Sequence, residues 1–177
     1  DNISVDHMLA LYPALKEVDL QTTSEVILGL PGETFENHIQ TLRDLVKARM
    51  DEIVVHTCML LDGSEMGLPD ERKKWEMKTK FRVLQRDFAK LSNGKKVIEY
   101  EEVVVGAKTF TYEDFLEIRG LSFMFFAVFS LNCHKWFFQF IRNLGIPLSN
   151  FFSNFVKPHH DENWPKGYLK FIKDLKS

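Results

Sequence analysis

The chain has 177 residues, of which 45% are hydrophobic, and its formal net charge is −2. This length can bury one or two hydrophobic cores, and the nearly neutral charge argues against a general polyanion-binding protein. Two cysteines provide no disulfide framework, and no charged and then apolar leader opens the sequence. We therefore expect a protein of the reducing cytoplasm.

The first predicted element is a helix that Ser4 caps. Its apolar residues follow a spacing of three and four positions: Val5, Met8, Leu9, Tyr12 and Leu15. Pro13 lies inside this pattern and is expected to kink or divide the helix, because it removes a backbone donor and clashes with the preceding turn.

A strand and a glycine-containing turn follow. The apolar run from 26 to 30 predicts a parallel strand that is covered on both faces. Gly29 and Gly32 allow the backbone to approach a ligand closely or to adopt left-handed angles, and Pro31 stiffens the bend. Taken alone, the same pattern also fits a tight connection to the next helix that binds no ligand.

The next helix and strand complete one unit. Thr34 is expected to cap a helix with Phe35, Ile39, Leu42 and Val46 on one side, and residues 53–58 predict a buried strand. The alternation predicts a right-handed parallel strand–helix–strand unit. In such units ligands bind at the carboxyl ends of the strands, which here are residues 29–33 and 56–59.

Residues 2–66 resemble the later strands of the radical S-adenosylmethionine barrel, especially the subgroup that often carries an upstream cobalamin-binding domain. The likeness rests on Gly29-Leu30-Pro31-Gly32-Glu33-Thr34, the following helix, the strand 52–59 and the loop 60–66. Asp62 and Ser64 replace the proline and threonine that are usual in that loop. The CxxxCxxC triad that holds the family's iron–sulfur cluster is missing, since Cys58 and Cys133 are the only cysteines.

The resemblance implies an α/β fold, with residues 1–68 forming the last strand–helix units of a partial (β/α) barrel. Residues 69–177 would form a mainly helical extension with a possible β-hairpin. We expect a fragment of a radical enzyme, inactive alone, because the chain opens on Asp1 and lacks the triad. Its main partner would be the missing upstream half of the barrel. The substrate and the reaction stay open.

The resemblance also implies that the strand ends form part of a wall around S-adenosylmethionine. The residues that carry this expected role are Leu28, Gly29, Leu30, Pro31, Gly32, His56, Thr57 and Met59. A [4Fe–4S] cluster would belong to the full-length parent and not to this fragment, as would cobalamin if the parent uses it, so no metal site is expected here.

Three residues near these strand ends are explained by structural roles more simply than by chemical ones. His56 fits a strand-end residue that has a backbone partner, and Glu33 fits an acid that complements the start of a helix. Cys58 fits a buried strand residue, because no basic partner can be assigned to it.

Beyond residue 66 the sequence contains a basic stretch followed by an acidic one. Residues 72–96 contain ten Lys and Arg against two acids, whereas residues 99–117 contain six acids against Lys108. Basic and aromatic surfaces can bind RNA, but the acidic stretch favours mutual neutralisation, so no nucleic-acid partner is expected. Residues 80–85 and 97–105, with Asn93-Gly94 between them, predict an antiparallel pair.

An aromatic helical region follows a capping box at Thr111–Asp114. Its apolar residues recur every three or four positions: Phe126, Phe129, Cys133, Trp136, Phe137, Phe140, Ile141 and Leu144. Such a stripe is usually core, and the second interpretation is a docking face. The longest apolar run, 121–131, is too short to span a membrane. A last amphipathic helix is expected from Trp164-Pro165 through Leu175.

Other signatures give no defined chemistry. His159-His160-Asp161-Glu162 fits a solvated loop better than a metal site, because adjacent residues point in different directions.

The competing function is a non-catalytic binding or assembly module that docks through the aromatic helices. A conventional S-adenosylmethionine transferase lacks support, because no glycine-rich loop follows a first strand.

Overall fold

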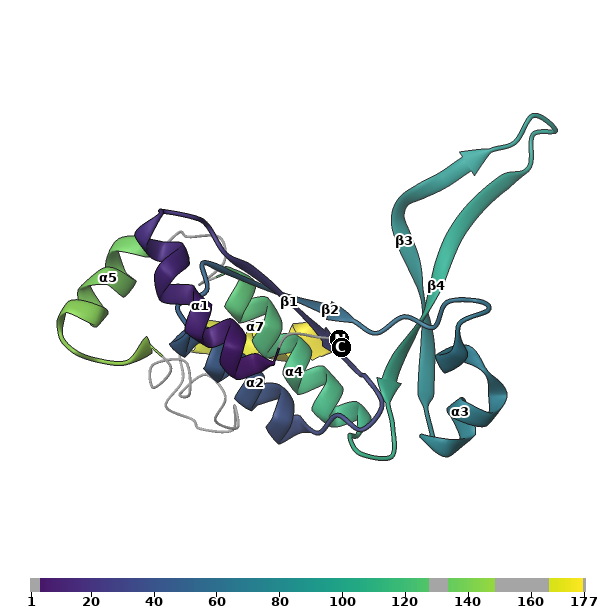
Figure 1. Cartoon of the computed structure of the whole chain (residues 1–177). Coiled ribbons are helices and arrows are strands. Elements are labelled where there is room, and N and C mark those ends of the chain that lie inside the picture. The colour runs from purple at the N-terminus through teal and green to yellow at the C-terminus, as the bar shows by residue number, and fades with distance from the viewer. Residues whose placement is uncertain (1–3, 128–133, 149–165, 177) are drawn as a thin grey trace. The chain divides into compact units, whose positions relative to one another are not determined.

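A computed structural model describes residues 4–127, 134–148 and 166–176 (Figure 1). The elements in chain order are α1 (Val5–Glu17), β1 (Thr23–Leu28), α2 (Phe35–Lys47), β2 (Glu52–Thr57), η1 (Glu65–Gly67), α3 (Pro69–Lys74), β3 (Lys78–Lys90), β4 (Lys96–Gly106), α4 (Tyr112–Phe125), α5 (Lys135–Asn143) and α7 (Lys166–Lys176). The protein is mixed α/β. Among the described residues the strands form two sheets of two strands each, and neither sheet closes into a barrel.

The chain divides into two compact units, which are interleaved in sequence. The first contains residues 1–26, 35–55 and 116–177, and the second contains residues 27–34 and 56–115. The division at residues 68 and 69, which rests on the family resemblance, stays a prediction.

β1 and β2 form a parallel pair that α2 connects. The carbonyl of Thr22 accepts a hydrogen bond from the Glu52 N–H at 3.1 Å, and the carbonyl of Leu28 accepts one from the Cys58 N–H at 2.7 Å. Since the start of one strand meets the start of the other, and likewise the ends, the strands run in the same direction. Figure 1 shows them side by side. The predicted strand–helix–strand order is confirmed, and its handedness stays a prediction.

The expectation that β1 is covered on both faces is wrong. Its residues alternate between more exposed and more buried positions, and Ile27 is 44% exposed. The strand also begins at Thr23, before the apolar run. Within the described residues the sheet has two strands only, and β1 has the alternation of a half-buried strand.

α1 begins where the sequence predicts. The Ser4 hydroxyl accepts a hydrogen bond from the His7 N–H at 3.2 Å and caps the helix. Pro13 does not divide α1, which continues to Glu17.

The core of the first unit gathers apolar residues from α1, α2, α4, α5 and β2 and from the loops beside them. Its buried members are Tyr12, Leu42, Leu45, Val46, Met50, Ile53, Phe125, Phe138 and Leu148. The amphipathic pattern of α2 is confirmed, with Ile39, Leu42 and Val46 buried. His38 is also buried, although the sequence pattern does not place it in the core.

The second unit contains the β3–β4 hairpin, which confirms the predicted antiparallel pair. Phe81, Val83 and Phe88 lie opposite Glu102, Tyr100 and Ile98 in the register. At the turn, Gly94 has a φ of +80° and its N–H donates to the Leu91 carbonyl at 2.8 Å. Asn93-Gly94 therefore reverses the chain as expected.

The capping box at the start of α4 is confirmed as well. The Thr111 hydroxyl accepts a hydrogen bond from the Asp114 N–H at 3.1 Å, and the Asp114 carboxylate accepts one from the Thr111 N–H at 2.8 Å. These reciprocal bonds satisfy donors that the first turn of a helix leaves free.

The expectation that the aromatic stripe is core holds for only part of it. Phe138 is buried and Ile141 half-buried, but Trp136 is 80% and Phe140 58% exposed. A nine-residue helix that packs on one side buries one stripe only, and α5 carries aromatic residues around most of its circumference. Phe129, Cys133 and Trp164 lie outside the described residues.

The last predicted helix is confirmed as α7, which ends at Lys176, one residue beyond the predicted end. Within residues 4–127, 134–148 and 166–176, no helix is long and apolar enough to cross a membrane.

Candidate functional site

The turn after β1 is closed by its own backbone. The Glu33 N–H donates to the Leu30 carbonyl at 3.1 Å, with Pro31 and Gly32 between them. Gly32 has a φ of +84°. Proline followed by a residue with positive φ is the signature of a type II turn, so both residues are explained by local geometry.

Glu33 ties this turn back to the end of β1. Its carboxylate accepts a hydrogen bond from the Gly29 N–H at 2.5 Å. Glu33 therefore has a structural role, as its place in the sequence suggested, but this contact holds a turn rather than the start of α2. The bond also occupies a backbone donor that a ligand would need.

Gly29 is required by packing within the second unit. Its φ is +100°, and a Cβ on it would lie 3.3 Å from the Val104 carbonyl oxygen and 3.4 Å from the Cys58 Cβ. The strand end thus approaches β4 more closely than a side chain allows. The glycine that suggested a ligand faces the protein itself.

Gly32 lies under an aromatic ring. A Cβ on it would lie 3.6 Å from the Trp75 ring, whose indole N–H donates to the Glu71 carboxylate at 3.1 Å. From the sequence, Trp75 belongs to a basic and aromatic stretch, and this packing role was missed. No local signal reveals it, because the contact joins residues more than forty positions apart.

The end of β2 lies between two neighbours. Besides the Cys58 N–H bond to Leu28, the Cys58 carbonyl accepts a hydrogen bond from the Val104 N–H at 2.9 Å. Cys58 is 3% exposed, and burial together with the charge of Glu33 raises the pKa of its thiol. A buried thiol whose pKa is raised is a poor nucleophile. The expected burial of Cys58 is confirmed, and the residue lies directly after the end of β2.

The eight residues assigned to the site by resemblance fall into three groups. Leu28 and Gly29 are buried. Pro31 and Thr57 are half-buried. Leu30, Gly32, His56 and Met59 are exposed, with Leu30 and Met59 each 40% exposed. The hydrogen bond from the Cys58 N–H to the Leu28 carbonyl joins the two strand ends. The exposed residues are close in sequence to this bonded pair.

An ion pair fastens α3 to the hairpin. The Arg72 guanidinium donates to both carboxylate oxygens of Glu102, at 2.6 and 2.7 Å, and the Thr79 hydroxyl donates to the same carboxylate at 2.5 Å. These bonds, the Arg72 bond first, lower the pKa of Glu102 to about 2. Arg82 pairs with Glu101 on the same hairpin. The expected neutralisation of the basic stretch by the acidic one is confirmed for these pairs.

In the part of the chain that the structure describes, no group of three His, Cys, Asp or Glu side chains could hold a metal ion. His159-His160-Asp161-Glu162 and Cys133 lie outside that part. A comparison with protein-family models and with curated proteins finds no match to this chain.

Proposed function

We propose that the chain contributes part of the wall around S-adenosylmethionine in a radical enzyme of the barrel type. The observation that supports this role is the parallel pair β1–β2, whose carboxyl ends are joined by the bond between Leu28 and Cys58. Ligands of α/β proteins bind at such ends. The residue order there is the one on which the family resemblance rests.

The chain's residues do not fit an iron–sulfur cluster. Such a cluster needs several thiolates, and Cys58 is a buried thiol whose pKa is raised. Cys133 is the only other cysteine in the sequence. In this proposal the cluster is held by another part of the enzyme, and no chemical step is assigned to it here.

The fit to S-adenosylmethionine is restricted to the exposed residues. Leu28 and Gly29 face the protein, and the Gly29 N–H is used by Glu33. Leu30 and Met59 offer apolar surface for an adenine ring or a methionine chain, and Gly32 and His56 offer backbone and polar contacts. When bound, the cofactor supplies an adenosyl or methyl group, and these residues position it and exclude water.

The test is to titrate the chain with S-adenosylmethionine in the millimolar range and follow backbone amide shifts by NMR. Leu30→Asp and Met59→Asp should weaken the response at the strand ends, because a charge replaces apolar contact surface. Leu61→Asp is the matched control, since Leu61 is also an exposed leucine but lies beyond the strand ends. Absence of any shift at residues 29–33 and 56–59 would overturn the proposal.

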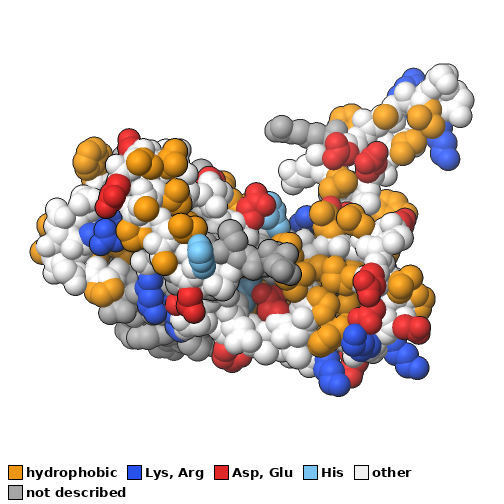
Figure 2. Space-filling view, viewed as in Figure 1, with side chains coloured by type: hydrophobic (Ala, Val, Ile, Leu, Met, Phe, Trp, Pro, Cys, Tyr) orange, Lys and Arg blue, Asp and Glu red, His pale blue; other side chains and the backbone are white. Residues whose placement is uncertain are grey.

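A second candidate is a non-catalytic docking module, and the outer face of α5 favours it. Trp136, Phe140 and Leu144 recur every four residues and are exposed, while Phe138 on the inner side is buried. Hydrophobic side chains are also visible along the β3–β4 hairpin (Figure 2), where Phe81, Phe88 and Tyr100 are exposed. Large exposed apolar surfaces tend to be interaction sites.

The double substitution Trp136→Ser with Phe140→Ser tests this candidate. If this face docks onto a second copy of the chain, the unmodified protein self-associates in light scattering, and the variant keeps its stability but loses that association. Phe138→Ser, on the buried side, should unfold the first unit and serves as the contrast. An outer-face variant that unfolds as readily would contradict docking. Indifference to S-adenosylmethionine in the amide titration would favour this candidate over the first.

A further inference from the structure

Two arginines of the first unit lie at the ends of separate helices and border the same hollow. Arg49 follows α2, and Arg142 lies in the last turn of α5. A cavity of about 340 Å³ is lined by both, by Lys47 and by apolar residues that include Val46, Ile146 and Leu148. The described lining contains these three cations and no acid, and of the three Lys47 is paired with Asp44 at 3.5 Å.

The backbone holds Arg49 at this place. The Arg49 N–H donates to the Val46 carbonyl at 3.1 Å and the Met50 N–H to the Leu45 carbonyl at 3.2 Å, and Arg49 has a φ of +60°. This is a Schellman ending, in which the left-handed position usually holds glycine. Asp19 and Glu76 also have positive φ values, so the conformation alone carries no functional argument. The Schellman ending fixes the position of the Arg49 Cα, from which the side chain extends.

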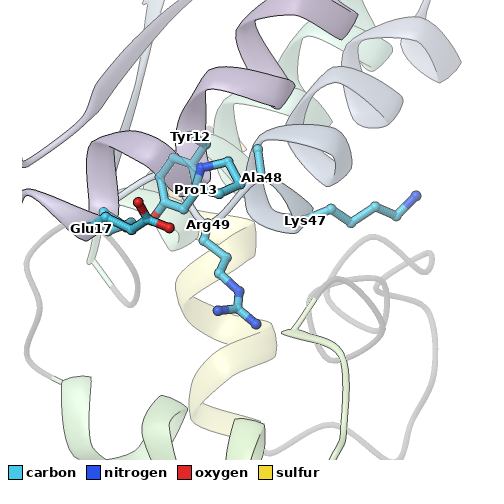
Figure 3. A pocket seen from close by; sticks show the side chains of 7 residues that line it. Tyr12, Pro13, Glu17, Lys47, Ala48 and Arg49 are labelled. Atoms are coloured by element: carbon cyan, nitrogen blue, oxygen red, sulfur yellow. The ribbon is translucent and has the colours of Figure 1, made fainter.

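Three hollows meet at Arg49. Besides the cavity already described, it lines one of about 440 Å³, whose lining includes Tyr12, Pro13, Lys47 and the acid Glu17. It also lines one of about 420 Å³, which contains Arg142 and the acids Asp19 and Asp51. Figure 3 shows the Arg49 side chain extending away from Tyr12 and Pro13, and the Lys47 side chain extending in a different direction. Arg49 is exposed to solvent and contributes to all three hollows.

Neither arginine is neutralised by a described neighbour. Arg72 and Arg82 each pair with a glutamate, whereas the guanidinium groups of Arg49 and Arg142 make no hydrogen bond or ion pair within the described residues. The nearby carboxylate of Asp51 accepts bonds from Lys16 and Thr22. Burial and the charge of Arg49 lower the pKa of Arg142, against the opposing influence of Tyr12 and Asp51. The charge of Arg49 thus disfavours the charged form of Arg142.

We propose that Arg49 and Arg142 form a binding site for a small anion that joins a phosphate or carboxylate group to a short apolar part. Guanidinium groups bind such oxygens through paired hydrogen bonds, and an anion relieves the repulsion between the two arginines. The apolar lining from Val46, Ile146 and Leu148 accounts for the second part of the ligand. A competing explanation is that basic residues at helix ends only complement the helix dipoles.

The experiment is a calorimetric titration of the whole chain with phenyl phosphate, with inorganic phosphate and phenol as comparison ligands. Saturable binding of phenyl phosphate is expected, weaker binding of inorganic phosphate, and none of phenol. Arg49→Gln and Arg142→Gln should each weaken phenyl phosphate binding roughly ten- to hundredfold, the usual effect of losing a hydrogen bond between charged groups.

Two further variants keep the result interpretable. Lys90→Gln removes an exposed cation of β3 and should bind as the unmodified chain does. Arg142→Lys keeps the charge and should retain more affinity than Arg142→Gln, with circular dichroism confirming that each variant folds. Failure of the unmodified chain to bind phenyl phosphate would overturn the proposal. So would folded Arg49→Gln and Arg142→Gln variants that bind phenyl phosphate as tightly as the unmodified chain does.

Discussion

Replacing Gly29 by alanine should destabilise the protein far more than replacing other glycines of similar backbone angle. A left-handed backbone costs a residue with a Cβ about 1–2 kcal/mol. The new methyl would also lie 3.3 Å from the Val104 carbonyl oxygen. Val104 is fully buried and its N–H is bonded to Cys58, so this carbonyl has little freedom to retreat. Crowding of this kind adds about 1–3 kcal/mol.

Two glycines provide matched controls. Gly94 has a φ of +80°, and a methyl group there would meet nothing within 4 Å. Gly32 has a φ of +84°, and a methyl group there would meet only the Trp75 ring at ordinary contact distance. Gly94→Ala and Gly32→Ala should each cost about 1–2 kcal/mol from backbone strain alone. Gly29→Ala should therefore exceed both by about 1–3 kcal/mol.

Urea unfolding followed by circular dichroism measures these differences as shifts of the midpoint at constant slope. The reasoning fails if Gly29→Ala unfolds at the same urea concentration as Gly94→Ala. That outcome would mean that the strand end and β4 separate at little cost, and that Gly29 is not required for packing.

Three further predictions concern single side chains. Glu33→Gln should cost about 1 kcal/mol, because the acceptor for the Gly29 N–H stays but loses its charge; an unchanged urea midpoint would contradict the bond. The pKa of Glu102 is lowered from 4.5 to about 2 in the folded protein, so its stabilising effect is complete above pH 4.5 and is lost as the pH falls from 4.5 toward 2. The stability difference between the unmodified chain and Glu102→Gln should shrink over that interval, and a constant difference would exclude this ion pair as the source. In a Cys133→Ser background, Cys58 should react with iodoacetamide slowly in the native protein and rapidly in denaturant at about pH 8, and equal rates would show that the thiol is accessible.

Local signals in the sequence predict much of the fold. The spacing of Ile39, Leu42 and Val46 predicts α2, the pair Thr111 and Asp114 predicts the start of α4, and Asn93-Gly94 predicts the hairpin turn. Each of these signals depends on residues a few positions apart, and hydrogen bonds or burial in the structure account for each one.

Features that depend on distant residues are not predictable in this way. The sequence suggests that Gly29 is open to a ligand, but Val104 and Cys58 lie against it. The aromatic spacing of α5 predicts a buried stripe, yet Trp136 is exposed, because spacing defines a helix face without stating which face finds a neighbour. The Arg49–Arg142 hollow was also missed, since each arginine alone is an ordinary basic residue near a helix end.

The interleaving of the two units affects how the chain can be divided. The chain leaves the first unit at residue 27, returns at 35, leaves again at 56 and returns at 116, so β1 and β2 each contribute to both units. No single cut separates one unit from the other. A protein expressed as residues 1–115 would contain every segment of the second unit but would lack α5, and with it Phe138 from the first unit's core. Shortened versions used for crystallisation should therefore retain residues 116–148, even when the region of interest is the hairpin.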